Sequence, residues 1–326
     1  MDFQLSCPTI QAGRIKSGMT EKRKKKWDSI VDNKESVSLS LVRAITRVNQ
    51  RANFKAKYQV LNQLCKGGCG SVFAGYRKAD HLQVAIKRVP QLNLKQVSLD
   101  GKKLPAEVAI MLKLAAEKDG SVGMAAPVEL LDWYDLGHEL ILVQERPLNA
   151  MDLFQYIEDK GSVQQEEARD IIKQLVDALI ALQERQIFHQ DIKLENILIV
   201  TGSTVPQVRL IDFGLSVIGK KDSVYRTFCG TREYIPPEWY NSSTYTAGPA
   251  TVWQLGIVLF EMLHICDRFS TKRFQKKVQR ISCRLSETCR NFLQLCLKMD
   301  PDVRATLTEL QLHPWLGVTA PPAEKI

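Results

Sequence analysis

The sequence lacks the features that mark a membrane-spanning, secreted or zinc-binding protein. No apolar run among its residues reaches the roughly 18 residues of a membrane helix. The N-terminus has no charged stretch followed by an apolar one, which is the pattern of a secretion signal. The eight cysteines include no C-x-x-C pair, and they predict reduced thiols. We therefore expect a cytoplasmic protein without a membrane span, with the nucleus as a second expected compartment.

The positive charge is concentrated at the N-terminus. Residues 1–57 hold 13 Lys and Arg against 5 acids, which accounts for +8 of the total net charge of +9. The nearly neutral remainder gives no reason to expect specific nucleic-acid binding. The run from Lys22 to Lys26 fits a solvated tail, or a nuclear-import or anionic-surface patch. We predict a basic, disordered leader over 1–57, in which 38–48 has some helical spacing.

The periodicity of the remaining sequence changes from strand-like to helical. Alternating apolar positions between glycine turns dominate residues 58–146, whereas helical spacing dominates residues 147–316. The longest predicted helix opens at a capping-box pattern beginning at Ser162 and runs to about Gln186. The order predicts an α+β fold with a small β-rich N-terminal lobe (58–146), a larger α-helical C-terminal lobe (147–316) and a tail over 317–326.

One polar octet carries the chemistry. The stretch from His189 to Asn196 reads H-x-D-x-K-x-x-N, the catalytic-loop pattern of protein kinases. Asp191 can orient a substrate hydroxyl and accept its proton, Lys193 can neutralise charge on the transferred phosphoryl group, and Asn196 can supply an oxygen ligand to Mg²⁺. We interpret His189 as a structural residue packed in the core. The octet predicts phosphoryl transfer from ATP.

A second motif supplies another predicted metal ligand. The sequence Asp212-Phe213-Gly214 lies 21 residues after Asp191 and follows a strand-like run. A carboxylate at this place would hold Mg²⁺ against the phosphates of ATP. Asn196 and Asp212 are therefore the predicted metal ligands, and ATP and Mg²⁺ the predicted cofactors.

A glycine-rich turn precedes these motifs in the chain. Backbone N–H groups approach phosphate oxygens closely only where side chains are absent. Cys65 replaces the first glycine of the usual pattern, whereas Gly67 and Gly70 remain. We favour neutral thiols at Cys65 and Cys69 over reactive thiolates. The predicted nucleotide contacts in this turn are Leu64, Cys65, Lys66, Gly67, Gly68, Gly70 and Val72.

A lysine at the end of the strand Val84-Ala85-Ile86-Lys87 completes the predicted nucleotide site. Lys87 should contact the α- and β-phosphates and act in catalysis. Its partner needs to be a carboxylate on the next helix, and Glu107 is the best candidate because it starts the apolar face of that helix. The other predicted nucleotide contacts are Ala85, Glu145 and Leu198.

The stretch from Gly230 to Glu238 is similar to the end of a kinase activation segment. Thr231 can hydrogen-bond near Asp191 and Lys193, a feature of kinases that phosphorylate Ser and Thr. Glu238 would form a structural ion pair with Arg304.

From about Tyr58 to Leu316 the chain resembles the Pim family of serine/threonine protein kinases. The proline of Glu145-Arg146-Pro147 is the most specific feature, because it removes a backbone N–H that most kinases offer to adenine. The resemblance implies two lobes with ATP between them, a monomer, protein substrates, and activity without activation-loop phosphorylation. The other motifs that carry it are Tyr58-Gln59-Val60, Leu130-Leu131-Asp132-Trp133, Asp152-Leu153-Phe154, Pro236-Pro237-Glu238-Trp239 and Val252-Trp253-Gln254-Leu255-Gly256.

Besides the glycine turn, three positions depart from the common kinase pattern or from the family. Gln190 replaces the Arg that precedes the catalytic Asp, so no cation stands there to receive a loop phosphate. Thr251 occupies the place of an Asp that supports the catalytic loop in most kinases, and Pim kinases also lack this Asp. Gln144 stands before the hinge, where the family has an apolar residue.

The resemblance implies acidic residues that bind the substrate, and this sequence retains some of them. Pim-like kinases prefer basic residues before the phosphoacceptor, and Asp152 and Glu195 match two of the acids that bind them. Thr231 is the third predicted substrate contact. Leu194 and Gln155 stand where acids are expected, and the stretch from Thr271 to Lys277 is basic where the family is acidic.

Two functions remain open on the sequence. An active serine/threonine kinase is favoured, because Lys87, Glu107, Asp191, Asn196 and Asp212 are all retained and losing one costs orders of magnitude in rate. The alternative is a pseudokinase or scaffold that binds nucleotide and partners with little turnover. The alternative depends on Cys65, Cys69, Gln190 and the altered substrate acids.

Overall fold

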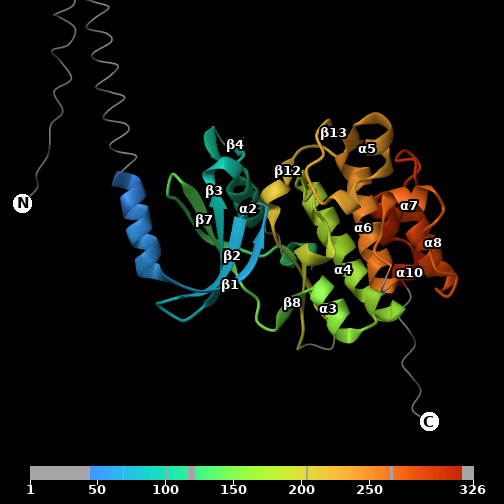
Figure 1. The fold of residues 1–326 in the computed structure, drawn as a ribbon, viewed down its shortest axis with the longest axis horizontal. Coiled ribbons are helices and arrows are strands. Elements are labelled where there is room, and N and C mark those ends of the chain that lie inside the picture. The colour runs from blue at the N-terminus through green and yellow to red at the C-terminus, as the bar shows by residue number, and fades with distance from the viewer. Residues whose placement is uncertain are drawn as a thin grey trace, which may run out of the picture.

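The computed structural model has two lobes, of which Figure 1 shows the β-rich one on the left and the helical one on the right. It describes residues 45–68, 70–99, 101–116, 122–202, 205–264 and 267–317. Residues 1–44 of the predicted leader, Cys69 and the tail beyond residue 317 lie outside the described residues. The predicted fold class is confirmed.

The N-terminal lobe is built on an antiparallel five-stranded sheet. Helix α2 (Ala106–Ala116) packs against one face of this sheet. A separate hairpin of β4 (Gln96–Leu99) and β5 (Lys102–Pro105) leads into α2. The strands of the main sheet, in spatial order, are β1 (Tyr58–Gly67), β2 (Gly70–Arg77), β3 (Gln83–Pro90), β7 (Glu139–Glu145) and β6 (Leu130–Asp135).

The alternation of side chains along β3 decides where its lysine points. Val84 and Ile86 are fully buried in the cluster on one face of the sheet. Val89 packs on the opposite face with Val108 of α2. Because successive residues of a strand point to opposite faces, Lys87 shares the face of Val89 and is directed toward α2. The apolar pattern of β3 therefore brings Lys87 to the helix that carries Glu107.

A helix over residues 45–57 lies against this lobe, within the segment that the sequence assigns to a disordered leader. Phe54 is buried to 5% exposure, with its ring centroid 6.0 Å from that of Tyr58 and 5.4 Å from that of Tyr134. The prediction of disorder is therefore wrong for residues 45–57. It fails because Ile45 and Val48 are exposed, so the apolar positions of this helix do not mark its buried face, whereas Phe54 alone among its large apolar side chains is buried and fills a site between aromatic rings.

The C-terminal lobe packs around two buried helices, α4 (Gln165–Glu184) and α6 (Ala247–Leu263). The capping box predicted at Ser162 is absent, since Gln164 occupies the N-cap without a side-chain cap. Among the described residues, no helix has the length and apolarity to cross a membrane. The remaining helices are α3 (Leu153–Lys160), α5 (Pro237–Ser242), α7 (Thr271–Gln275), α8 (Glu287–Cys296), α9 (Leu307–Gln311) and α10 (Pro314–Gly317).

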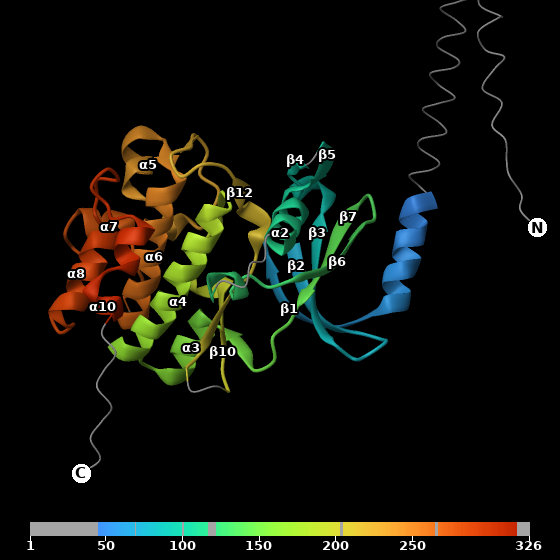
Figure 2. The same cartoon turned by 180° about the vertical axis from the view of Figure 1, so that it is seen from behind.

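Short strand pairs hold the loops near the lobe junction (Figure 2). The strands are β8 (Ala150–Asp152), β10 (Ile197–Val200) and β11 (Gln207–Leu210) in one sheet, β9 (Ile187–Phe188) with β12 (Val217–Ile218), and β13 (Val224–Tyr225) with β14 (Tyr245–Thr246). The predicted catalytic loop connects β9 to β10, and Asp212 follows β11. Pairing of β10 with β11 therefore fixes both motifs side by side.

We expect Phe54→Ala to lower the free energy of unfolding by about 3 kcal/mol, since the change empties an aromatic site. Thermal and urea unfolding of the full chain would measure the effect. The matched control is Asn53→Ala, which alters an exposed neighbour on the same helix and should leave stability nearly unchanged. Equal stability of both variants would contradict the packing role of this helix.

Candidate active site

Lys87 joins the two lobes through a buried ion pair. Its Nζ lies 2.7 Å from Oε1 of Glu107 on α2 and 2.7 Å from Oδ1 of Asp212 in the C-terminal lobe. The side chains of Lys87 and Glu107 are only 5% and 7% exposed. Burial favours a lower pKa for Lys87, but the Glu107 and Asp212 carboxylates outweigh it and hold that pKa above its ordinary value. The predicted pairing of Lys87 with Glu107 is present.

Asp191 is held on both of its carboxylate oxygens. Thr231 donates to Oδ1 from its backbone N at 2.9 Å and from its hydroxyl at 2.8 Å. Lys193 Nζ lies 2.9 Å from Oδ2, and Asn196 Nδ2 donates to the same oxygen at 3.0 Å. Lys193 also donates to the Thr231 hydroxyl at 2.9 Å. The structure thus brings together the predicted base, the predicted phosphoryl-neutralising lysine and the predicted substrate contact Thr231.

The oxygens of Asn196 and Asp212 fit a hard divalent cation. The Asn196 amide nitrogen is bound to Asp191, and within the described residues its Oδ1 accepts no hydrogen bond. Asp212 has one oxygen on Lys87 and a side chain that is 37% exposed. Although burial favours a higher pKa for Asp212, the Lys87 ammonium lowers it below its ordinary value, which keeps the carboxylate ionised. Amide and carboxylate oxygens are suitable ligands for Mg²⁺.

Among the described residues, no cluster of three or more His, Cys, Asp or Glu could hold a metal ion. A two-ligand site of Asn196 and Asp212 is the arrangement expected for Mg²⁺, which is usually bound by one or two protein groups together with phosphate oxygens and water.

His189 is structural, as the sequence predicts. It is 1% exposed, and burial lowers its pKa, so the imidazole is neutral near pH 7. Its Nε2 lies 2.9 Å from the Ile211 carbonyl oxygen, and its ring packs 4.9 Å from that of Phe213. The imidazole therefore ties the catalytic loop to the segment that carries Asp212.

The glycine turn between β1 and β2 combines open space with one close contact. A Cβ at Gly67 or Gly68 would meet nothing within 4 Å. Gly70 has a φ of +155°, and a Cβ there would lie 2.2 Å from the Arg88 carbonyl oxygen. The open glycines leave room for phosphate oxygens, whereas Gly70 is required by the approach of β3. Burial raises the pKa of Cys65, in agreement with a neutral thiol.

Glu145, the last residue of β7 at the start of the hinge, binds other residues of the protein through its carboxylate. Glu145 lies in an ion pair with Arg209 and accepts a hydrogen bond from the Glu129 backbone N at 3.2 Å. Its side chain is therefore occupied, which leaves the main chain of Glu145 for the predicted nucleotide contact. Gln144, one residue earlier, is 5% exposed and donates to the Met111 sulfur at 3.2 Å. Leu198, on β10, is partly exposed.

A glutamine of α6 clamps the catalytic loop, which sequence reasoning missed. Gln254 is 2% exposed, accepts a hydrogen bond from the Ile192 backbone N at 3.2 Å and donates to the Gln190 carbonyl at 3.0 Å. These peptide groups flank Asp191 directly. Thr251, at the position of the usual supporting Asp, instead bonds the Ala247 carbonyl of its own helix. The sequence signal was a polar residue inside an otherwise apolar helix.

The side chain of Gln190 is also fixed by a hydrogen bond, in addition to the bond at its backbone carbonyl. Its backbone has a φ of +70°, and its Oε1 accepts a hydrogen bond from the Tyr245 hydroxyl at 2.8 Å. Tyr245 packs against the rings of Tyr225, Phe228 and Trp239 at centroid distances of 5.5–5.9 Å. Burial raises the pKa of Tyr245, so its hydroxyl remains a donor. Neutral groups thus occupy the place of the missing Arg.

The end of the activation segment is anchored by the predicted ion pair. Arg304 binds both carboxylate oxygens of Glu238, at 3.0 and 2.8 Å, and its side chain is fully buried. The same guanidinium donates to the Pro249 carbonyl at 2.8 Å. A bidentate pair with this many contacts fixes the segment rigidly onto the lobe.

The predicted substrate acids differ in availability. Asp152 caps α3 by accepting from the Gln155 backbone N at 2.9 Å. Glu195 is exposed. Sequence reasoning missed a buried acid, Glu261, whose oxygens accept from the Tyr234 hydroxyl at 2.5 Å and the Phe269 backbone N at 3.2 Å.

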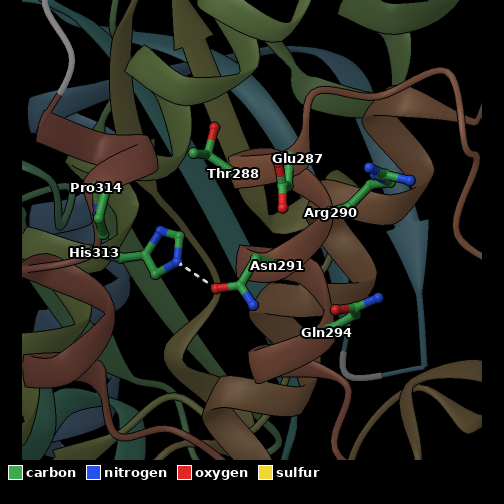
Figure 3. A pocket seen from close by; sticks show the side chains of 7 residues that line it. All are labelled: Glu287, Thr288, Arg290, Asn291, Gln294, His313 and Pro314. Carbon is green, nitrogen blue, oxygen red and sulfur yellow. Dashed lines mark hydrogen bonds between the residues drawn. The ribbon is translucent and has the colours of Figure 1, made fainter.

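A cavity of about 600 Å³ in the C-terminal lobe has no part in this site. Figure 3 shows its lining residues, among which His313 lies 2.9 Å from Asn291 Oδ1. The cavity lies between α8 and α10, and none of the predicted site residues lines it. Its lining residues are Glu287, Thr288, Arg290, Asn291, Gln294, His313 and Pro314.

Comparison with known proteins decides the family. Residues 58–316 match the protein kinase domain. The chain belongs to the protein kinase family. This kinase is 34% identical to the serine/threonine-protein kinase pim-2 of Danio rerio over 287 residues, which cover 86% of this chain and 91% of the relative. The resemblance to Pim kinases is thereby confirmed.

Two further relatives extend the comparison. The kinase is 30% identical to the serine/threonine-protein kinase prk-2 of Caenorhabditis elegans over 81% of this chain and 59% of the relative. It is 28% identical to the sperm motility kinase 2A of Mus musculus over 85% of this chain and 54% of the relative. The chain therefore spans slightly more than half the length of these two relatives.

We expect Gln254→Ala to lower kcat of this kinase roughly tenfold with a small change in the KM for ATP, because two buried hydrogen bonds to the catalytic loop are lost. Steady-state kinetics on a peptide would measure it, and Gln254→Glu should retain the bond from Ile192. The control Thr251→Ala removes a hydroxyl that bonds only its own helix. A purely structural role would lower the melting temperature and leave kcat of the folded fraction unchanged.

Proposed function

We propose that this protein is an active Mg²⁺- and ATP-dependent serine/threonine kinase that transfers the γ-phosphate to hydroxyl groups of proteins. The Lys87–Glu107–Asp212 ion pair carries the proposal, because it joins the nucleotide lysine, its helix and a metal ligand in one connected arrangement. The serine/threonine-protein kinases pim-2 and prk-2, at 34% and 30% identity, support it.

The residues divide the reaction between them. Lys87 is placed to bind phosphate oxygens, and Asn196 and Asp212 would hold Mg²⁺, which neutralises charge on the phosphates. Asp191 orients the attacking hydroxyl and takes its proton. Because both Asp191 oxygens are already bound, one of the present contacts has to lengthen when substrate enters. Lys193 then faces the transferred group and offsets its negative charge.

We further propose that the kinase is active without phosphorylation of its activation segment. In kinases with an Arg before the catalytic Asp, a loop phosphate can pair with that cation. Here Gln190 is satisfied by Tyr245 and Gln254, and β13 pairs with β14. Neutral hydrogen bonds and aromatic packing thus order this segment without added charge.

Two of the departures that favoured a scaffold, Gln190 and Cys65, have physical explanations within an active site. Gln190 is part of a connected clamp, and the neutral thiol of Cys65 lies in a strand that still reaches the open glycines. No contact in the described residues favours the scaffold alternative over catalysis.

We also propose that the kinase acts as a monomer in the cytoplasm and the nucleus. The free thiols of Cys65, Cys229 and Cys283 suit a reducing compartment. The run from Lys22 to Lys26 suits nuclear import.

We expect Asp191→Asn to reduce γ-phosphate transfer to Ser/Thr peptides by at least about a thousandfold, because the base is lost while most hydrogen bonds can be kept. Radiolabelled ATP with a degenerate peptide array would measure it, and Mg²⁺-dependent thermal shifts with ATP would show that binding survives. Wild-type protein that binds Mg²⁺ and ATP but transfers no more phosphate than the variant would refute the kinase proposal.

Phosphatase treatment should leave kcat within about twofold of its starting value, since Gln190 provides no cation at the position where most kinases bind a loop phosphate. Intact-mass spectrometry would verify that phosphate has been removed. Tyr245→Phe should lower activity because it deletes the hydroxyl bound to Gln190, whereas Tyr240→Phe, at an exposed ring, should not. Loss of activity on dephosphorylation would overturn the proposal.

A further inference from the structure

A basic surface follows α6 in the C-terminal lobe. Between residues 267 and 286 the chain carries seven Lys or Arg and one acid, Asp267. All seven basic side chains are exposed. We call this set the basic segment; its cations are Arg268, Lys272, Arg273, Lys276, Lys277, Arg280 and Arg284.

Carboxylates of the chain neutralise little of this charge. Arg273 pairs with Asp267 at 3.0 Å, and it is the one member of the basic segment in a direct ion pair among the described residues, although the charge of Arg268 acts to lower the pKa of Glu261. Lys272 and Lys276 stand four residues apart at α7, a spacing at which like charges repel and destabilise a helix. Lys272 and Arg273 stand in the last turn of the five-residue α7, where cations are favourable, but Lys277, Arg280 and Arg284 lie beyond it. The accumulated charge is therefore not explained by the stability of this lobe.

The basic segment adjoins the surface that receives a protein substrate. The Thr271 hydroxyl donates to the Ile235 carbonyl at 2.8 Å, four residues after the Thr231 that binds Asp191. Lys272 lies over the ring of Tyr240 on α5, with Nζ 5.1 Å from the centroid. Helices α5 and α7 are neighbours in the C-terminal lobe (Figure 1). A peptide chain leaving Asp191 therefore has these cations within reach.

Arg268 places a further positive charge next to α3. Its guanidinium lies 4.5 Å from the ring centroid of Phe154 on α3, two residues after the predicted substrate contact Asp152. Two acids in this region are engaged, because Asp152 caps α3 and Glu261 accepts from Tyr234 and Phe269, whereas Glu195 and Glu233 are exposed. Exposed cations thus outnumber available carboxylates where a substrate's charged residues would lie.

We propose that the basic segment binds an acidic stretch of the protein substrate, next to the phosphorylated Ser or Thr. This inference rests on the proposed function. It replaces the preference for basic substrates that the family resemblance implies, because Arg268, Lys272 and Lys276 repel such substrates. A protein is favoured over a nucleic acid because an acidic stretch of the substrate is tethered to the bound acceptor and needs no separate binding event.

The test uses one serine peptide in three forms, with glutamates, alanines or arginines on either side of the acceptor. Wild-type kinase should phosphorylate the glutamate peptide with kcat/KM roughly tenfold above the alanine peptide, since several exposed charge pairs each contribute modestly. Added salt should reduce this ratio through screening. Equal rates on these two peptides, or a preference for arginine, would overturn the inference.

Charge-reversal variants test whether the preference for the glutamate peptide depends on the basic segment. Lys272→Glu/Lys276→Glu should abolish the preference for glutamate and leave kcat/KM on the alanine peptide unchanged. The matched control is Lys102→Glu/Lys103→Glu, which makes the same charge change at exposed residues of β5 in the other lobe and should keep the preference. Retention of the preference in the first variant would refute the assignment.

Anisotropy of a fluorescent glutamate peptide gives a readout that does not depend on turnover. Wild type should bind it roughly tenfold more tightly than Lys272→Glu/Lys276→Glu. If no peptide is phosphorylated, the proposed function fails, but this binding difference still decides the inference. A single-stranded oligonucleotide that binds more tightly than the peptide, and loses binding in the same variant, would show that the surface serves nucleic acid instead.

Discussion

The buried ammonium of Lys87 is the constraint on which the rest of the structure depends. A cation in a nearly dry environment is stable only when carboxylates surround it, and removing one partner of such a pair costs about 3–5 kcal/mol. Glu107 comes from α2 and Asp212 from the other lobe. Satisfying one charge therefore sets the position of α2 against the sheet and of the smaller lobe against the larger one.

The catalytic loop is held in place by hydrogen bonds from neutral side chains rather than by an ion pair. Two peptide groups beside Asp191 are bound by the Gln254 amide, and the side chain of Gln190 by a tyrosine hydroxyl. Burying the groups of a neutral hydrogen bond costs less desolvation free energy than burying an ion pair. A side-chain amide has both a donor and an acceptor, so it can bind a backbone carbonyl and a backbone N–H at the same time. A carboxylate cannot do this.

Much of the fold and site could be predicted because the relevant signals are local. The octet around Asp191 and the strand ending at Lys87 each occupy a few consecutive residues, and their kinase pattern called for a carboxylate on the next helix, for which Glu107 was the best candidate. The role of Gln254 could not be predicted, since it depends on how closely α6 approaches a loop more than sixty residues earlier. The docking of Phe54 depends likewise on Tyr134, eighty residues away. Local patterns give each element its buried face but not its distant partner.

The amide at the back of the hinge bears on how small molecules could distinguish this kinase from its relatives. Gln144 places a polar head, bound to the Met111 sulfur, where the resemblance to Pim kinases implies an apolar side chain. A sulfur is a weak acceptor, so the amide gives up little when it turns toward a better partner. An inhibitor carrying a hydrogen-bonding group at that depth would gain a directional contact here that an apolar side chain at the same position could not give. One buried side chain thereby offers a chemical basis for selectivity within a family whose catalytic residues are shared.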